Sequence, residues 1–440
     1  MLTRRRFLNI GFAGLAATAA GCHPADLAWE NNPVNRTLAS HPALVDKAAL
    51  ADKKRLFLGY PINMNSPPEE FFAWRRELRT AGIGSFAYNN VGNPYRPSAI
   101  PFNTHDLERE TILAFGKLLG FEPDNIWGFL SHSGTDSNMH GMYMGRTLLK
   151  GRTGLLPKCY FTKEAHYSIQ ILRDLLGLEG VLVRTHSDSG MDTDHLAQTL
   201  AENVQYPALV VATAGTTFKG GIDNVELIRK VLGKHPSFLH LDAALFGGYL
   251  PYTEHRGIVA HHSEDNPTQN RYDSIAVSCH KFFGFPAPAG LFVTRGKVFE
   301  EFNELYGRIH NPEYIGHVPG TITCSRDAVK PAEFRYFSTD HAMKKLAADA
   351  QAILSDTQYL LSEMQNNFSD LQPRRSSEYS NTLYFRKPGD WLVHKYSLAT
   401  MHLSDGRSTQ DYAHVVVMPH ADRQVLEEFL SDLEKLRRVS

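Results

Sequence analysis

Residues 208–244 read ALVVATAGTTFKGGIDNVELIRKVLGKHPSFLHLDAA, and this stretch decides the fold. The apolar run over 208–214 predicts a strand. Residues 224–232 carry apolar side chains at helical spacing, and a second apolar run, Phe238–Leu241, leads directly to an aspartate. A strand, a helix and a second strand in this order predict a βαβ unit with parallel strands.

The same alternation continues on both sides of this unit. Apolar runs at Gly180–Thr185, Ile275–Ser278 and Leu291–Thr294 predict further strands, and helices are expected over Asp106–Leu119 and Asn138–Leu149. These patterns predict an α/β fold with a mostly parallel sheet that is covered by helices on both faces. In such sheets, ligands bind beyond the carboxyl ends of the strands.

The pattern changes in the last quarter of the chain. Residues Pro331–Met364 predict one long helix, and Ala413–Met418 predict a strand. A final helix presents one apolar stripe, formed by Val425, Phe429, Leu433 and Leu436. We therefore expect an N-terminal segment with a large domain over 51–333, and a small α+β C-terminal domain over 334–440.

Composition excludes several classes of protein. The chain has 440 residues, of which 42% are hydrophobic, and 46 basic residues balance 47 acidic ones to a net charge of -1. This balance argues against a broad surface for nucleic acid. The four cysteines form no CxxC pair, so no zinc site or disulfide framework is expected. The pair His261–His262 lies in a polar stretch, where we expect a solvated loop without a metal role.

The N-terminus resembles an export signal. Three arginines, 4–6, precede an apolar run over 10–20 that is too short to span a bilayer comfortably. We predict a twin-arginine signal over 1–22 and a tether over 23–50. Residues 19–22 resemble a lipoprotein cleavage box, which would leave a lipid anchor on Cys22, whereas 17–19 offer an ordinary cleavage site. The expected location is the periplasm or its membrane surface, or the cytoplasm if the signal is not used; the alternative is a basic amphipathic helix.

Two segments near the middle of the chain suit a phosphate and a flat ring. The stretch SGTDSN at 133–138 enters a predicted helix, so free N–H groups and the Thr135 hydroxyl could bind a phosphate beside Gly134. His166, in KEAHYS at 163–168, could stack on a heteroaromatic ring. The alternatives are a simple helix cap and a structural histidine.

Two further segments carry charged groups past the ends of predicted strands. Asp242 follows an apolar strand, where a buried carboxylate could keep a pyridine nitrogen protonated, and the small Ala244 would admit a ring. Lys281, in SCHK at 278–281, could form a Schiff base if its surroundings lower its pKa, with Ser278 and His280 adding phosphate contacts. The alternatives are a capping aspartate and a surface lysine.

Taken in this order, the segments resemble the group II pyridoxal-phosphate (PLP)-dependent amino-acid decarboxylases, in particular their histidine and serine decarboxylases. The resemblance runs from about Tyr60 to near the C-terminus. It includes further motifs at 214–217, 220, 222–223, 314, 321–323, 325–326 and 414–419. It implies PLP fold-type I, which is aspartate-aminotransferase-like, and a homodimer with active sites at the subunit interface.

The resemblance also implies a role for each site residue. Lys281 would carry PLP, Asp242 would pair with the ring nitrogen, and His166 would stack on the ring and contact the substrate. The remaining cofactor contacts would come from Ala244 on the other face, Thr216 beside the ring, and Gly134, Thr135, Ser278 and His280 at the phosphate. Tyr314 is the candidate for reprotonating Cα, with His166 second.

The implied activity is that of a carboxy-lyase, which converts an L-amino acid to its amine and CO2, with histidine the leading candidate. The alternatives are another PLP carbon–carbon lyase or aldehyde synthase, a decarboxylase of serine or an aromatic amino acid, an exported binding protein on a decayed PLP scaffold, and a metal-binding lipoprotein. Residues 324–329 read CSRDAV where relatives read GSRNGH, and the polar stretch 255–271 is longer than usual. The first difference bears on the substrate.

Overall fold

The computed structural model describes residues 47–262, 269–404 and 409–439. The chain divides into two compact units, 1–53 and 54–440. Of the first unit, only the start of helix α4 (Lys47–Arg55) belongs to the described residues, so the predicted signal over 1–22 lies outside them. Within the described part, no helix combines the length and the apolar character that a membrane span requires.

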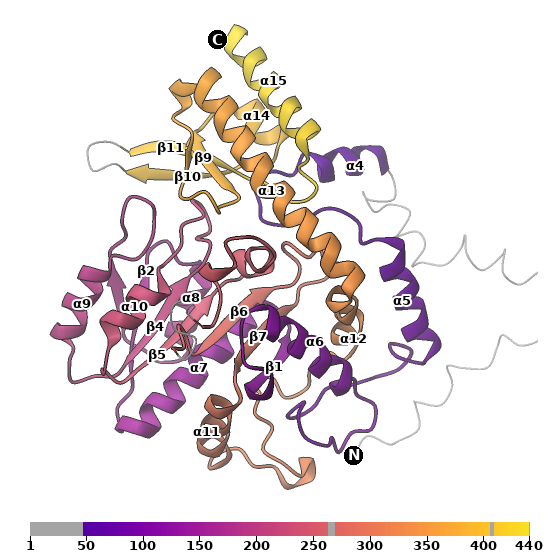
Figure 1. Ribbon diagram of the computed structural model, residues 1–440, viewed down its shortest axis with the longest axis vertical. Helices are drawn as coiled ribbons and strands as arrows, with labels where there is room; N and C mark the ends of the chain where they lie inside the picture. The colour runs from indigo at the N-terminus through magenta and orange to yellow at the C-terminus, as the bar shows by residue number, and fades with distance from the viewer. Residues whose placement is uncertain (1–46, 263–268, 405–408, 440) are drawn as a thin grey trace, which may run out of the picture. The chain divides into compact units, whose positions relative to one another are not determined.

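A seven-stranded sheet forms the centre of the second unit (Figure 1). Its order is β1-β7-β6-β5-β4-β2-β3, and the strands β3, β2, β4, β5 and β6 are parallel, whereas β7 is antiparallel to both of its neighbours. The bounds are β1 Ile126–Ser131, β2 Lys158–Thr162, β3 Gly180–Val183, β4 Ala208–Thr213, β5 Ser237–Asp242, β6 Ser274–Ser278 and β7 Gly290–Arg295. The mostly parallel sheet predicted from the sequence is confirmed.

Helices cover both faces of this sheet (Figure 1). One core packs α6, α9 and α10 against one face, and a second core packs α7, α8 and α11 against the other. The bounds are α5 Glu69–Thr80, α6 His105–Leu118, α7 Gly134–Thr153, α8 Tyr167–Leu175, α9 Thr193–Glu202, α10 Val225–Leu232, α11 Gly296–Gly307 and α12 Val329–Phe334. All six residues of β4 are buried because both of its faces meet a core, which explains its continuous apolar run.

The C-terminal part contains a second, antiparallel sheet of order β10-β11-β9-β8. Its elements are α13 Asp340–Asn367, β8 Arg374–Arg375, β9 Thr382–Arg386, α14 Asp390–Lys395, β10 Ala399–Ser404, β11 Thr409–Val416 and α15 Arg423–Val439. The apolar stripe predicted for the last helix packs into the core through Val425, Phe429 and Leu433. Short 3-10 turns connect the larger elements at 123–125, 246–248, 250–252, 256–258, 313–315, 335–338 and 369–371.

Two predictions of local structure are wrong. The single helix expected over Pro331–Met364 is broken, because Thr339 is extended (φ -76°, ψ 150°) and its side chain caps α13 by accepting the N–H of Ala342. The solvated loop expected at His261–His262 fails for His261, which is fully buried and stacks on Phe121 with a 4.0 Å centroid separation. His261 is buried because it packs against Phe121, an aromatic residue that is distant in the sequence.

Candidate active site

The strand ends predicted to carry chemistry meet at one cavity of about 210 Å³. The carboxyl ends of β4, β5 and β6 and the turn that precedes α7 surround it, as expected for a doubly covered parallel sheet. Its lining residues are Ser133, Gly134, Thr135, Asn138, His166, Ser168, Thr213, Gly215, Thr217, Asp242, Ala244, Ser278, His280, Lys281 and Pro288. Eight of the ten residues singled out in the sequence therefore line one cavity.

Asp242 and Lys281 supply the two opposite charges of this cavity. Asp242 is the last residue of β5 and is buried, and its Oδ1 accepts the N–H of Ala244 at 3.1 Å. Lys281 follows β6 on the loop that returns to β7. Burial lowers the pKa of the Lys281 amine below its ordinary value, and the charge of Asp242 opposes that shift. A lysine in such surroundings is suited to covalent chemistry as a neutral amine.

His166 is fixed by the start of helix α8. It is the N-cap residue, and its Nδ1 accepts the backbone N–H of Ser168 at 3.3 Å and lies 2.8 Å from the Ser168 hydroxyl. Burial lowers its pKa, Lys281 lowers it further, and Asp242 opposes both. Because a backbone N–H can only donate, Nδ1 is the acceptor, and the proton of the neutral ring is on Nε2.

The turn before α7 forms the side of the cavity suited to a phosphate. Ser133 caps the helix, because its Oγ accepts the N–H of Asp136 at 3.2 Å. The N–H groups of Gly134 and Thr135 belong to the first turn, which has no acceptors within the helix. A Cβ at Gly134 would collide with Ser278 Oγ, so a larger residue there would displace the hydroxyl at the end of β6. Backbone donors and the positive end of a helix together bind anions.

The end of β6 and the start of β7 lie against the turn that precedes α7. Ser278 is the last residue of β6, and its backbone N–H donates to Ala244 O at 3.2 Å. His280 Nδ1 lies 3.4 Å from Ala289 O, and burial lowers the pKa of its ring. Gly290 lies beside the turn as well, since a Cβ there would meet Ser133 O at 2.5 Å. Two hydroxyl groups, an imidazole and a helix terminus thus converge on one side of the cavity.

Two predicted site residues do not line the cavity of their own chain. Thr216 is fully buried, and its Oγ1 accepts the N–H of Gly221 at 2.8 Å, while the adjacent Gly215 and Thr217 line the cavity. Tyr314 lies in a short 3-10 turn with 82% of its surface exposed.

Seven of the fifteen lining residues were not singled out from the sequence, and three of them bear on the chemistry of the cavity. Thr213 ends β4 with a buried Oγ1 that has no partner among the described residues, and Ser168 orients His166. Asn138 is buried, and its Oδ1 lies 2.9 Å from His240 Nε2. The position of Thr213 at the end of a predicted strand was a usable signal, whereas the orientation of Asn138 depends on a residue 102 positions away.

These residues fit pyridoxal phosphate. A primary amine with a lowered pKa, a buried carboxylate and an imidazole suit the aldehyde, the ring nitrogen and the ring face, and the glycine-lined helix start suits the phosphate. The Thr213 hydroxyl, which has no partner among the described residues, adds a donor that a ligand could use.

Comparisons with known proteins agree with this chemistry. The model of the pyridoxal-dependent decarboxylase conserved domain matches residues 152–359. A histidine decarboxylase of Mesorhizobium japonicum is 28% identical over 89% of this chain and 96% of its own length. One from Solanum lycopersicum is 26% identical over 88% and 86%, and serine decarboxylase 1 of Oryza sativa is 28% identical over 88% and 74%.

Solved structures show the same fold. L-methionine decarboxylase from Streptomyces superposes with a TM-score of 0.76 at 21% identity, and the match covers 95% of this chain and 98% of that one. Glutamate decarboxylase of Lactobacillus brevis gives 0.70 at 15% identity, over 97% and 95%. Cavity, sequence relatives and fold agree on a pyridoxal-phosphate-dependent amino-acid decarboxylase, and the chain is similar over most of its length to the histidine and serine decarboxylases of group II.

Proposed function

We propose that this decarboxylase acts on L-histidine and releases histamine and CO2. The observation that carries the proposal is the placement of Asp242, Lys281 and His166 on one cavity, combined with sequence relatives that are named histidine decarboxylases. Relatives named serine decarboxylases match to a similar extent, so serine is the second candidate.

Lys281 would hold the cofactor covalently through Nζ. The low polarity around the amine favours its neutral form, which is the nucleophilic one. The negative charge of Asp242 opposes this effect of burial on the pKa of Lys281. When bound, PLP withdraws electrons from the bonds at the substrate Cα, and this is the chemistry that the cofactor supplies.

Asp242 would keep the ring nitrogen protonated. Its carboxylate is buried, and its Oδ1 already accepts the N–H of Ala244, which fixes the side-chain rotamer. A fixed anion at this depth raises the pKa of any cation paired with it. Asp242 therefore acts by its charge, and a neutral isostere would remove the effect without changing the shape of the cavity.

His166 would stack on the ring and direct Nε2–H toward the substrate. The Ser168 N–H holds the ring from the Nδ1 side, so the tautomer needed for donation is preset. A neutral donor suits a substrate carboxylate, because it binds the anion without stabilising it as strongly as a cation would.

Tyr314 is proposed as the acid that returns a proton to Cα. Because it is 82% exposed and lies outside the cavity of its own chain, it would act in a homodimer, in the active site of the other subunit. A mixture of inactive Lys281→Ala and inactive Tyr314→Phe subunits tests this assignment. Recovery of activity in the mixture supports it, whereas no recovery moves the role to His166.

The first experiment records absorbance spectra of purified protein before and after a panel of amino acids that includes histidine and serine, while CO2 is collected. We expect a band near the visible edge that shifts with histidine, evolves CO2 and is lost in Lys281→Ala. A response to serine or an aromatic amino acid instead would change the substrate. A PLP band without CO2 would indicate another carbon–carbon lyase or an aldehyde synthase, and no band would indicate a binding protein.

Export through the twin-arginine route is proposed for residues 1–22, on the basis of the arginines at 4–6 and the apolar run that follows. This route carries folded proteins, which suits an enzyme that loads its cofactor in the cytoplasm. Cell fractionation of wild type and of Arg4→Lys/Arg5→Lys/Arg6→Lys tests export, and Cys22→Ala tests the lipid anchor. Retention of the wild type in the cytoplasm would contradict the proposal.

A further inference from the structure

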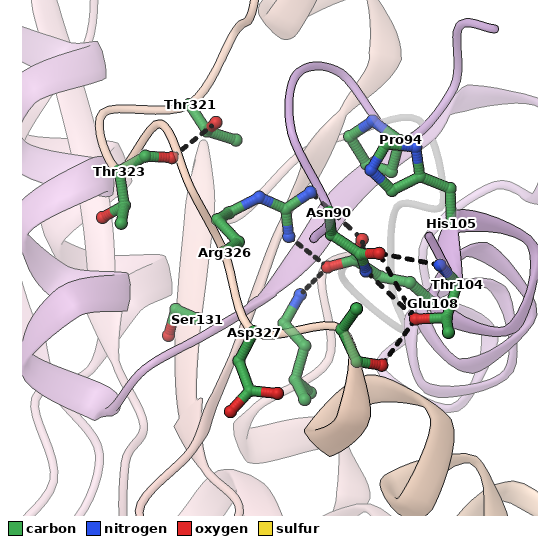
Figure 2. Close-up of polar contacts among 12 residues, drawn as sticks. Asn90, Pro94, Thr104, His105, Glu108, Ser131, Thr321, Thr323, Arg326 and Asp327 are labelled. Carbon is green, nitrogen blue, oxygen red and sulfur yellow. Dashed lines mark hydrogen bonds and ion pairs between the residues drawn. The ribbon is translucent and has the colours of Figure 1, made fainter. Parts of the chain in front are cut away.

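A buried ion pair lies beside the phosphate side of the cavity and takes no part in the chemistry proposed above. Glu108 on α6 meets the guanidinium of Arg326 through both carboxylate oxygens, and the two side chains are 0% and 1% exposed (Figure 2). We call Glu108, Arg326 and Asn90 the Glu108 cluster. Its members come from three segments that are far apart in the sequence.

The members of this cluster make further contacts with one another and with a neighbouring ring. Asn90 Nδ2 donates to Glu108 Oε2 at 3.1 Å, and the Asn90 N–H donates to Arg326 O at 3.1 Å. Arg326 also lies over the ring of Phe129, 5.1 Å from its centroid. A buried pair with this many additional hydrogen bonds has one geometry, so the segments that carry it are held in register.

The first link from the cluster to the cavity runs through strand β1. Glu108 Oε1 accepts the N–H of Leu130 at 2.9 Å. Because β1 is the edge strand and pairs only with β7, this N–H has no partner strand on its outer side. Leu130 is four positions before Gly134, so the carboxylate fixes the strand end from which the phosphate turn starts.

The second link runs through the segment that carries Arg326. Thr323 Oγ1 donates to Asp136 Oδ1 at 3.3 Å, and Asp136 Oδ2 accepts the N–H of His132 at 2.9 Å. Asp136 also donates its own N–H to the Ser133 cap. Arg326 therefore holds Thr323 against the phosphate turn from one side, while Glu108 holds β1 from the other.

We propose that Glu108 and Arg326 are positioning residues that set the phosphate turn for the cofactor. The inference rests on the proposed function, since it takes the ligand of this turn to be the phosphate of PLP. Neither residue lines the cavity, and their effect reaches it through Leu130 and through the Thr323–Asp136 hydrogen bond. Shifting these anchors would misalign the N–H groups at Gly134 and Thr135 while leaving Lys281 in place.

The test compares the affinities of the apoprotein for PLP and for pyridoxal, which lacks the phosphate. In Glu108→Gln, which keeps the side-chain shape but leaves Arg326 unpaired, we expect PLP binding to weaken about tenfold and pyridoxal binding by less than about twofold. Arg326→Lys keeps the charge but not the two-pronged contact, and should fall between Glu108→Gln and wild type. Competition by inorganic phosphate should weaken in parallel.

Thr323→Val provides a variant that leaves the buried pair untouched. It removes only the hydroxyl that contacts Asp136, and we expect PLP binding to weaken about threefold with pyridoxal unchanged. If Glu108→Gln does not fold, this variant decides the question. The control is Asp432→Asn, which removes the charge of a buried aspartate paired with the partly exposed Lys395 in the C-terminal part, and should leave the ratio of the two affinities at the wild-type value.

Each result has one meaning. A selective loss of PLP affinity in Glu108→Gln or Thr323→Val supports the positioning role. Equal losses for PLP and pyridoxal, or no loss, overturn it and leave the cluster with a role in folding stability alone. Failure of the wild type to bind PLP would instead contradict the proposed function, and this outcome is visible before any variant is made.

Discussion

The cavity and the Glu108 cluster both place charged groups inside the protein, but they differ in how those groups are satisfied. In the cavity, the Lys281 amine and the Asp242 carboxylate face an open volume of about 210 Å³. In the cluster, both oxygens of Glu108 are occupied by donors from Arg326, Asn90 and Leu130. The charged groups of the cavity therefore remain able to bind a ligand. Those of the Glu108 cluster are already paired, and their pairing holds the surrounding segments in one geometry.

The largest effect on activity is expected when the Lys281 amine is removed from the cavity. Lys281→Ala should lower decarboxylation by about 10⁴-fold or more, because covalent attachment of the cofactor is lost. Its unfolding free energy should stay at the wild-type value or rise by about 1 kcal/mol, since a buried amine is removed. CO2 release and denaturant unfolding measure the two effects, with the exposed Lys345→Ala as control. A large loss of stability in Lys281→Ala would contradict the expectation that the cavity contributes to activity and not to folding stability.

Asp242→Asn should reduce turnover by about 10²- to 10³-fold, because the neutral amide no longer favours a protonated ring nitrogen. The visible band should remain, since Lys281 is intact. Spectra and CO2 release on the same preparation check this prediction. Turnover within threefold of wild type would show that the charge of Asp242 is not used.

In the Glu108 cluster, a substitution is expected to affect folding stability more than turnover. Glu108→Gln should lower the unfolding free energy by about 3 kcal/mol, because Arg326 becomes an uncompensated buried charge. Turnover at saturating PLP should stay within about threefold of wild type. The double variant Glu108→Gln/Arg326→Met should recover part of the stability. If the double variant is less stable than the single one, the pair is not the source of the loss.

The smallest effect concerns His140, which packs beside the cluster among Trp127, Phe129 and Phe292 with no partner for either ring nitrogen among the described residues. Burial, with Arg326 as a lesser cause, lowers its pKa from 6.5 to about 3. A lowered pKa means that the stability contribution is complete above pH 6.5 and is lost as the pH falls. From pH 7.5 to 5.5 the loss is about 1.4 kcal/mol.

His140→Phe removes this titration, so the variant should lose about 1.4 kcal/mol less than wild type between the same two pH values. Denaturant unfolding at pH 7.5 and 5.5 measures the difference. The variant His402→Phe serves as the control for replacing an exposed histidine by phenylalanine. An unchanged slope in His140→Phe would mean that the ring is charged or hydrated in the folded state.

Most of the large sheet could be predicted from the sequence, because β4, β5, β6 and β7 are apolar runs buried on both faces. The run IWGFLS of β1 was not recognised as a strand, although it precedes the phosphate turn. Its place at the edge, beyond the antiparallel β7, depends on pairing with residues more than 150 positions away. The break before α13 was missed because a cap of one residue interrupts an otherwise helical pattern.

The site was predictable where function follows directly from a strand end, as with Asp242 and Lys281. It was not predictable where the position of a side chain depends on distant contacts. Glu108 and Arg326 are 218 residues apart, and neither has a local signature. Asn138 lines the cavity only because α7 begins at Gly134, and no sequence pattern reveals that Tyr314 is exposed on a turn outside the cavity of its own chain.

Gly134 and Gly290 have a consequence for directed evolution. A Cβ at Gly290 would collide with the backbone of Ser133 and a Cβ at Gly134 would displace the Ser278 hydroxyl, so a substitution at either glycine would disturb the phosphate turn. Libraries that aim at a new amino acid should leave this turn constant. Variation should be placed around His166 and in the segment that carries Tyr314, where side chains can change size without moving the backbone that holds the phosphate.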